Sequence, residues 1–428
     1  MPAEVMELHD LDVADEPLPG VNLVGYLDAE FGLGEAARML GRALEHGGVP
    51  IAAITNTETP VRREHELRWP LSRSVPYDIN VLCLQPDQVA GFATQVGPSF
   101  FENRSTIGLW FWDSSVLDAR YHQAFRFLDR VWVMTEHVRE VVSAATDMPV
   151  HLIPIAPQER TPPGTSREEL GLPAEFLFMA LFDFVSFERK NPLGMIDAFV
   201  RAFEPSQDAA LFLKSINGRE RKPKLLAQLQ SVVADRDDIT LVDGYVGAAK
   251  RDALLATCDC FVSLHRAEGL GLPMLEAITL ARPVIATGYL GNMQFMDGES
   301  SYLVPFELVP IPEGEWGFSA GAKWAEPDVA AAASHMRRVY EKRDEARARA
   351  IGARRRLFSE FSLDKAARVL TDELEDARRT RMLTGDEVQR QKRLAVEAAR
   401  AERAHARWGS IRGARGIIGR LHERLTRH

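Results

Sequence analysis

The stretch Ser263-Leu-His-Arg-Ala-Glu-Gly-Leu-Gly-Leu-Pro-Met-Leu-Glu276 decides the fold that we expect for this 428-residue chain. An apolar run at 260–264 leads into it and predicts a buried strand, while Pro273 stands where proline favours the start of a helix. A glycine loop between a strand and a helix is where ligands bind in an open parallel α/β sheet. The stretch therefore predicts an α/β domain with a site at the carboxyl ends of its strands.

The residue types in this stretch favour a phosphate and a sugar as ligands. The glycines permit close approach of the backbone, and the free N–H groups at a helix start favour a phosphate. Glu268 in the loop and Glu276 in the first turns of the helix flank those groups. Because one carboxylate accepts two hydroxyl donors, the pair suits the vicinal hydroxyls of a ribose and of a hexose. The alternative is that the two glutamates only cap a loop and a helix.

Alternating strand and helix patterns extend from this stretch toward both ends of the chain. Around it, strands are predicted at 176–182, 210–214, 239–242 and 283–287, and helices at 192–203, 224–234, 250–257 and from 328 to about 378. Nearer the amino terminus, Val21–Tyr26 predicts a strand, Gly32 and Gly34 lie in the next loop, and helical spacing starts at Glu35. Further strands are predicted at 51–54, 79–84, 106–111, 131–134 and 150–153. The chain therefore contains two doubly wound α/β domains.

Prolines mark the boundary between these two domains. Pro154, Pro157, Pro162 and Pro163 crowd a polar stretch with little periodicity, which is typical of a linker. We predict a first domain at 1–157, a linker at 158–173 and a second domain with terminal helices at 174–380. Residues 381–428 are predicted to form a basic, partly amphipathic and exposed helical tail, broken at Gly409, Gly413, Gly416 and Gly419.

The composition argues against several classes of protein. No stretch approaches the roughly 18 consecutive apolar residues of a membrane-spanning helix, and the acidic amino terminus lacks the pattern of a secretory signal. The net charge is −9, although residues 388–428 hold eleven Lys or Arg against three Glu. An acidic body argues against nucleic acid as a partner. The chain has three cysteines, Cys83, Cys258 and Cys260, which predict neither a disulfide framework nor a metal site. We therefore expect a cytoplasmic protein.

The segment Glu268-Gly-Leu-Gly-Leu-Pro-Met-Leu-Glu276, followed by Ala281-Arg-Pro-Val-Ile285, resembles the signature of family-4 retaining glycosyltransferases, the group 1 glycosyl transferases. Further matches lie at Ile107–Asp113, Val131–Thr135, Arg189-Lys-Asn-Pro192 and Gly291–Met296. The resemblance implies the GT-B fold, in which two Rossmann-like domains face each other across a cleft. It also implies transfer of a sugar, with retention, from a nucleoside diphosphate donor to a hydroxyl of a glycan or lipid-linked acceptor. Neither a metal nor another cofactor is implied.

The resemblance also implies roles for single residues. Glu268 would bind the transferred sugar, Glu276 the donor ribose, and Lys190 the departing diphosphate. The amides of Gly269, Leu270, Gly271 and Leu272 would lie near that diphosphate. Gly32 and Gly34 would lend amides from the first domain, or form only a tight turn. Trp112 and Asp113 would face the acceptor, although a packed aromatic core explains the tryptophan as well.

One departure from the family pattern leaves the diphosphate clamp open. Many relatives carry a Gly-Arg pair where this chain has Leu181-Phe-Asp183, so Arg189 or Lys214 would take the place of that arginine. Lys214 ends an apolar strand, where a charge is costly unless it emerges into a cleft. Arg189 has the alternative of a solvated residue at a helix start. His265 adjoins the site, or is a buried histidine at a strand end.

Other functions remain open from the sequence. A nucleotide-sugar epimerase or a sugar phosphorylase can use the same fold, and so can a non-catalytic scaffold of a glycan-assembly complex. The tail is either a solvated helical extension or a contact with an anionic membrane surface through residues 388–428. In the second case the protein would be peripheral on the inner face of the membrane.

Overall fold

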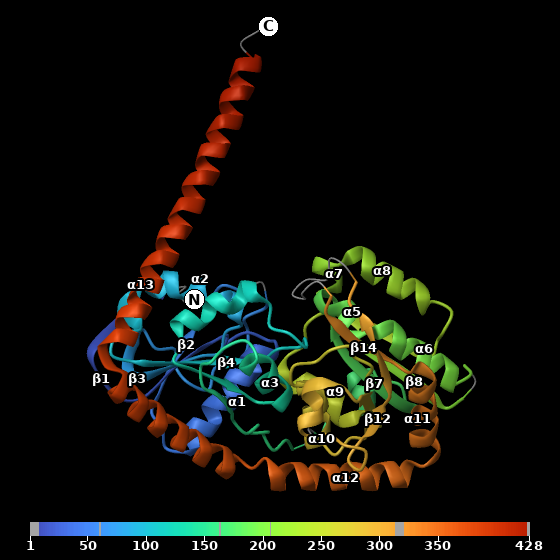
Figure 1. Cartoon of the computed structure of the whole chain (residues 1–428). Helices are drawn as coiled ribbons and strands as arrows, with labels where there is room; N and C mark the ends of the chain where they lie inside the picture. Colours follow the sequence, from blue (N-terminus) through green and yellow to red (C-terminus); the bar gives the residue numbers. More distant parts are fainter. Residues whose placement is uncertain (1–7, 60, 162–163, 206, 313–320, 426–428) are drawn as a thin grey trace.

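The computed structural model describes residues 8–59, 61–161, 164–205, 207–312 and 321–425. Two six-stranded sheets lie side by side, each covered by helices, and two long helices run along one face of the molecule (Figure 1). Every strand pair within these two sheets is parallel. The predicted pair of doubly wound domains is therefore confirmed.

The first sheet has the strand order β2-β1-β3-β4-β5-β6. The predicted strand Val21–Tyr26 corresponds to the end of β1, whose residues 21–25 are all buried. The strand itself begins earlier than predicted, at Asp12, because residues before the apolar run also pair with β3. The strands are β1 (Asp12–Gly25), β2 (Ile51–Thr55), β3 (Ser74–Leu82), β4 (Ser105–Trp110), β5 (Arg130–Val133) and β6 (Val150–Leu152). The helices are η1 (Leu8–Asp10), α1 (Gly32–His46), α2 (Pro86–Val96), η2 (Pro98–Phe100), η3 (Ala119–Phe127) and α3 (Glu136–Ser143).

The second sheet has the strand order β12-β11-β10-β7-β8-β9, so the order reverses between β7 and β10. Such a reversal opens a crevice at the carboxyl ends of the two strands, where ligands bind in doubly wound folds. The strands are β7 (Phe176–Asp183), β8 (Ala209–Ile216), β9 (Ile239–Asp243), β10 (Cys260–Ser263), β11 (Val284–Thr287) and β12 (Tyr302–Val304). The helices are α4 (Arg167–Leu170), η4 (Phe184–Ser186), α5 (Phe187–Lys190), α6 (Pro192–Ala202), α7 (Gly218–Arg221), α8 (Pro223–Val232), α9 (Ala248–Thr257), α10 (Leu272–Thr279), η5 (Leu290–Gln294) and α11 (Val329–Glu341). A small antiparallel pair, β13 (Phe306–Pro310) and β14 (Lys323–Pro327), has no counterpart in the predicted elements.

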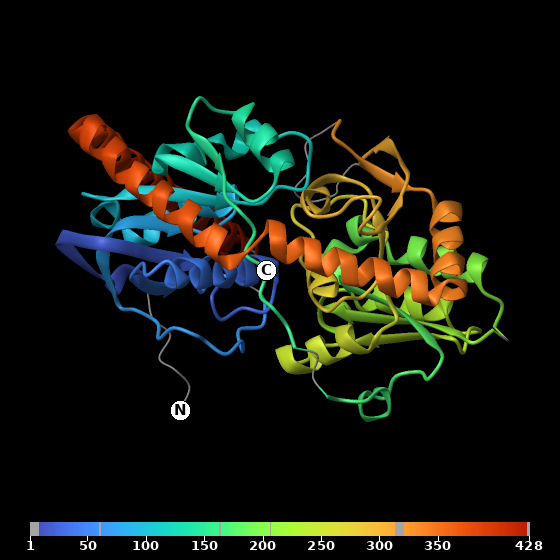
Figure 2. The same ribbon diagram turned by 90° about the horizontal axis from the view of Figure 1, so that it is seen from below.

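The last two helices connect the domains a second time. Helix α12 (Arg343–Glu360) contacts α10 of the second domain, and α13 (Leu363–Leu425) contacts α1 and α2 of the first. Figure 2 shows α12 crossing below the second domain and α13 continuing below the first. We predict that residues up to 380 belong to the second domain, whereas residues 363–380 lie in α13, the helix that packs against the first domain.

The tail differs from its prediction in two ways. Helix α13 is continuous to Leu425, so the predicted breaks at the four glycines 409, 413, 416 and 419 are wrong. Its part before residue 404 is not an exposed extension, because Lys392 and Val396 are buried against the first domain. Lys392 forms an ion pair with Asp129 there. None of the helices within the described residues combines the length and the apolar character needed to cross a membrane.

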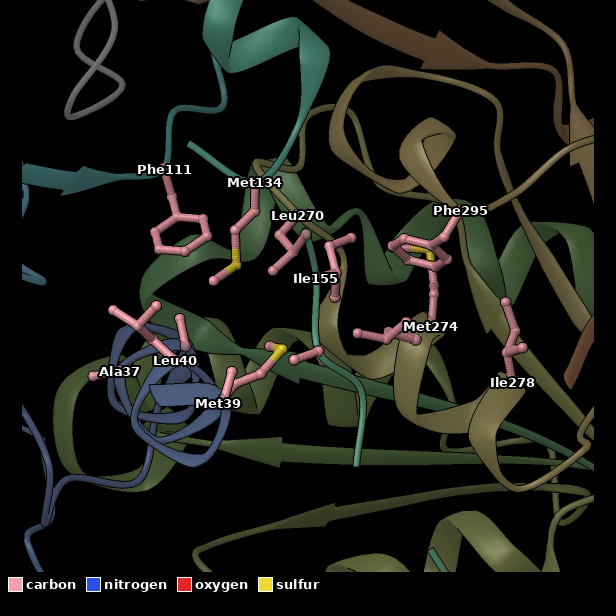
Figure 3. Close-up of a cluster of buried hydrophobic side chains, with 14 of the residues drawn as sticks. Ala37, Met39, Leu40, Phe111, Met134, Ile155, Leu270, Met274, Ile278 and Phe295 are labelled. Carbon is pink, nitrogen blue, oxygen red and sulfur yellow. The ribbon is translucent and has the colours of Figure 1, made fainter. Parts of the chain in front are cut away.

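An apolar cluster joins the two domains beneath the predicted site. Phe111, Met134 and Ile155 of the first domain belong to the same buried cluster as Leu270 and Met274 of the second. Figure 3 shows Leu270 next to Met134 and Ile155, so the glycine loop is packed between the domains. Burial of this apolar area holds the loop at a fixed place between the two sheets.

Candidate active site

The glycine loop lies at the crevice between β7 and β10. It connects β10 to α10, and Gly271 precedes the helix with a φ of +94°, a left-handed conformation that glycine adopts without strain. A side chain at Gly271 would also approach Met274 and Asn292 to about 3 Å. On the other side of the crevice, α5 follows β7 and ends at Lys190. The fold therefore brings Glu268 and Lys190, two of the residues singled out in the sequence, into contact.

Glu268 is an ionised carboxylate held by cations. Burial alone would raise its pKa, but the charges of Lys190 and Arg189 outweigh burial and hold the pKa at about 2. Lys190 forms an ion pair with Oε2 of Glu268, and Nη1 of Arg189 lies 3.5 Å from the same oxygen. Asn191 fixes this arrangement, because its amide donates to the carbonyl of Leu264 at 3.0 Å and its oxygen caps α6.

Arg189 connects the two domains. Its Nε lies 3.1 Å from Oδ2 of Asp113 in the first domain, and its Nη1 donates to the carbonyl of Ala267 at 2.9 Å. The side chain is 18% exposed, so Arg189 is not the solvated helix-start residue of the alternative prediction. Its position gives the predicted acceptor-side residue Asp113 a direct electrostatic link to Glu268.

The first-domain glycines lie close to the same loop. Helix α1 begins at Gly32 rather than at the predicted Glu35, so Gly32 and Gly34 form its first turn. A side chain at Gly34 would meet the carbonyls of Tyr26 and Ala29 at 2.6 Å, whereas one at Gly32 would meet only Leu272, at 3.7 Å. No side chain caps the start of α1 or of α10. Two helix starts with uncapped N–H groups therefore lie next to each other, which favours an anion between them.

Glu276 has a different set of partners. Its Oε1 accepts from Nη2 of Arg160 at 2.9 Å and lies 3.1 Å from Nη2 of Arg251. The carboxylate raises the pKa of Arg251, with Asp252 and Glu35 adding to the effect. The structure thus places Glu276 beside the loop, in a cluster separate from the contacts of Glu268.

Lys214 is engaged away from both glutamates. Its Nζ donates to the carbonyl of Ser215 at 2.7 Å and to that of Gly244. Burial lowers the pKa of this lysine to about 8. Asp183 lies in the segment where the arginine of the family pattern is missing. Both of its carboxylate oxygens accept from the side-chain amide of Asn217, each at 2.9 Å. These contacts bring no additional cation to the Glu268 cluster.

His265 is fully buried behind the glycine loop. Its Nδ1 lies 3.0 Å from Oγ of Ser263, and its Nε2 lies 3.2 Å from Oδ1 of Asn292. Burial lowers its pKa to about 4, so the imidazole is neutral at physiological pH. These contacts correspond to the alternative of a buried strand-end histidine.

Trp112, a predicted acceptor-side residue, lies where the two domains meet. Its indole N–H donates to the carbonyl of Val116 at 2.9 Å, and its ring packs edge-on against Tyr121. A side chain at Gly269 would lie 3.3 Å from the backbone of Trp112, so the two domains touch here. No group of three or more His, Cys, Asp or Glu within the described residues has an arrangement that could hold a metal.

Two arginines of the site had no signal in the sequence. Arg160 lies in the predicted linker, and Arg251 lies in α9 outside every quoted match. Neither arginine belongs to a motif together with Glu276, so only the packing of the linker and of α9 brings them to this carboxylate. Lys190 and Asn191, in contrast, lie within the quoted Arg189–Pro192 segment.

Comparison with known families identifies the second domain. Residues 178–309 match the family model described as glycosyl transferases group 1. The matched segment includes β7, α5, the glycine loop and α10. The predicted resemblance to this family is therefore confirmed for the second domain. A comparison with curated protein sequences gives no match.

Solved structures show the fold of most of the chain. Anabaena HepE in complex with UDP and glucose has a TM-score of 0.61 at 13% identity, and the match covers 84% of this chain and 100% of HepE. Sucrose-phosphate synthase from Thermosynechococcus elongatus has a TM-score of 0.61 at 15% identity, covering 84% of this chain and 99% of the synthase. A glycosyltransferase from Rickettsia africae has a TM-score of 0.58 at 13% identity, with 84% and 98% covered. The fold is GT-B, as predicted.

Proposed function

We propose that this chain, whose residues 178–309 form a group 1 glycosyl transferase domain, transfers a sugar from a nucleoside diphosphate donor to a hydroxyl acceptor. The observation that carries the proposal is the ion-paired cluster of Glu268 and Lys190 in the crevice between β7 and β10. There, at the start of α10, Glu268 offers a carboxylate to sugar hydroxyls and Lys190 offers a cation to a leaving diphosphate. The acceptor hydroxyl belongs to a glycan or a lipid-linked sugar in this proposal.

The proposed reaction retains the configuration of the sugar. The bond between the anomeric carbon and the bridging phosphate oxygen breaks, and its electron pair stays on the diphosphate. Lys190 and the N–H groups at the starts of α1 and α10 stabilise that charge. The acceptor oxygen bonds to the same face of the sugar, and its proton passes to an oxygen of the departing phosphate. A separate protein base is therefore not required.

The remaining roles follow from the positions of the two glutamates. Glu268 binds hydroxyls of the transferred sugar, since it shares the crevice with Lys190. Glu276 binds the ribose, because it follows the amides of residues 269–272 along the chain. Asp113 and Trp112 border the acceptor side, where Asp113 pairs with Arg189. Lys190 supplies the cation in this scheme, and no metal or other cofactor is assigned.

Two measurements test the proposed activity. Thermal shifts with UDP, GDP, dTDP and ADP, and with their sugars, identify the nucleotide; UDP comes first because HepE was solved with it. Product analysis with a sugar-labelled donor then separates transfer to an acceptor from epimerisation of the donor and from phosphorolysis. We expect one nucleotide to stabilise the protein and the label to appear on an acceptor. If no nucleoside diphosphate stabilises the wild type, the proposal is wrong.

We further propose that the end of α13 contacts an anionic membrane on its cytoplasmic face. The support is that this helix extends away from the body of the molecule (Figure 1) and that its last part is rich in arginine. Lys392, Arg400 and Arg403 contact the first domain instead, so the proposed contact is limited to the residues after Arg403. Each basic residue near an anionic surface contributes about 1 kcal/mol.

Vesicle sedimentation tests the membrane contact. A chain ending at Arg403 keeps Lys392 and Val396, which pack against the first domain, and is therefore a better control than a shorter one. We expect the full chain to sediment with phosphatidylserine vesicles and the shortened chain to remain in solution. Vesicles of phosphatidylcholine alone control for attraction to the charge. Equal sedimentation of the two chains would contradict the proposal.

A further inference from the structure

The linker between the two domains contributes an arginine to the cluster around Glu276. The guanidinium of Arg160 is 11% exposed and contacts two carboxylates at once. Its Nη2 donates to Oε1 of Glu276 at 2.9 Å, and its Nη1 pairs with Asp252 of α9. Because a guanidinium is planar, two partners on neighbouring nitrogens fix its orientation.

Glu276 is held through only one of its two oxygens. Arg160 and Arg251 both approach Oε1, at 2.9 Å and 3.1 Å. Within the described part of the chain, no donor contacts Oε2 of this carboxylate. The hydrogen bond from Arg160 and the ion pair with Arg251 both engage Oε1, so the acceptor capacity of Oε2 stays available. Rotation of the carboxylate would break both ion pairs in a side chain that is only 8% exposed.

The cluster also adjoins the first domain. A cavity of about 20 Å³ beside Glu276 and Arg160 is lined by Glu35 and Arg42 of α1 as well as by Gln158 of the linker. The position of Arg160 therefore depends on the path of the linker between the two domains. A change in the arrangement of the domains would move the arginine relative to Glu276.

We propose that Arg160 is a positioning residue, which holds the carboxylate of Glu276 so that Oε2 faces the donor ribose. The inference rests on the proposed function, in which Glu276 binds the ribose hydroxyls. It adds that a residue of the linker sets the preference of the site for a ribose over a deoxyribose. In the opposite arrangement, Arg160 fills the ribose position and the donor displaces it. Removal of Arg160 would then tighten binding of the ribonucleotide.

The test compares two nucleotides that differ by one hydroxyl. The dissociation constants of UDP and 2′-deoxy-UDP are measured for the full chain, or those of GDP and 2′-deoxy-GDP if GDP is the nucleotide that stabilises it. A hydroxyl bound to a carboxylate makes the wild type prefer the ribonucleotide by about tenfold or more. In Arg160→Gln we expect this preference to fall to about twofold, mainly through weaker binding of the ribonucleotide. Arg160→Lys should recover part of it, since one ammonium cannot pair with both carboxylates in the same geometry.

Two further variants make the result decisive. Asp252→Asn weakens the pairing of Asp252 with both Arg160 and Arg251 while leaving their contacts with Glu276 in place, and should lower the preference by a smaller factor; it also serves if Arg160→Gln does not fold. Arg354→Gln removes a neighbouring ion pair with Glu159 of the linker and should leave the preference unchanged. Equal weakening of both nucleotides in Arg160→Gln, or tighter binding of the ribonucleotide, would overturn the positioning role. Failure of the wild type to bind any nucleoside diphosphate would instead defeat the proposed function.

Discussion

Glu268 and Glu276 stand eight residues apart in one motif, yet the structure surrounds them with cations of different origin. Glu268 is paired with Lys190, which is part of a second recognisable segment of the same domain. Glu276 is paired with Arg160 from the linker and Arg251 from α9. The loop carrying Glu268 also touches the first domain through the ion pair of Arg189 with Asp113. Glu268, the carboxylate nearest the proposed reaction, is thus held by residues of sequence motifs. Glu276, the proposed ribose carboxylate, is held by residues that only packing brings together.

The largest effect is expected at Glu268. Glu268→Gln keeps the shape of the side chain but removes the charge that Lys190 and Arg189 face, and kcat should fall by about 10²- to 10³-fold. The measurement is turnover of the donor identified by thermal shift, together with a check of folding. Glu188→Gln is the matched control, since Glu188 lies in the same helix as Lys190 but is 47% exposed and pairs with Arg266. A folded Glu268→Gln enzyme with wild-type turnover would contradict the role of this residue.

The second prediction concerns His265, the titrating neighbour on the Glu268 side. Its pKa is about 4 in the folded chain and near 6.5 when unfolded. Between these values the unfolded chain binds a proton that the native chain does not, so the free energy of unfolding falls as the pH falls from 6.5 to 4. The total is about 3 kcal/mol. Glu268 has a pKa of about 2 in the folded chain against 4.5 in the unfolded chain, so its own contribution is lost between about pH 5 and 2 and overlaps that of His265 only near the acidic end of this window.

Urea unfolding at several pH values checks the histidine. The wild type should lose stability through this window, and His265→Gln should show a flatter profile. Parallel profiles for the two proteins would show that another group titrates there.

The third prediction separates the two glutamates. Glu276→Gln should weaken binding of the nucleoside diphosphate by about tenfold, because a charged acceptor for a ribose hydroxyl is replaced by a neutral one. Its kcat at saturating donor should change far less than that of Glu268→Gln, since the ribose is remote from the breaking bond. Calorimetric titration gives the affinity and steady-state kinetics give kcat. A variant that keeps its affinity but loses kcat would reverse the two assignments.

The smallest effect is expected across the domains. Asp113→Asn weakens a partly exposed ion pair with Arg189 by about 1 kcal/mol, so kcat/KM should fall by about fivefold. Added salt should reduce the difference in kcat/KM between variant and wild type, because dissolved ions screen a partly exposed ion pair. Asp147→Asn, at an exposed position of the same domain, should have no effect. An equal fall of kcat/KM in both variants would show that the ion pair of Asp113 with Arg189 has no specific role.

The sequence predicted most strands of both sheets, because buried parallel strands are continuous apolar runs. It missed β12, which is only three residues long, and β13 and β14, each of which is a five-residue run that ends in proline. It also predicted breaks in α13 at four glycines, yet a glycine costs a helix only about 1 kcal/mol, and the helix continues through them. The burial of Lys392 and Val396 could not be predicted, since helical spacing identifies an apolar face but not the surface that covers it.

The sequence by itself determined the α/β class, the two domains and the glycine loop. These features depend on local patterns, in which a residue's neighbours along the chain set its conformation. Only the tertiary structure decided that Asp113 pairs with Arg189, that Arg160 and Arg251 hold Glu276, and that Lys214 is used by two carbonyls. Such contacts join residues far apart in the chain, and their distances follow from how the two sheets and the linker pack.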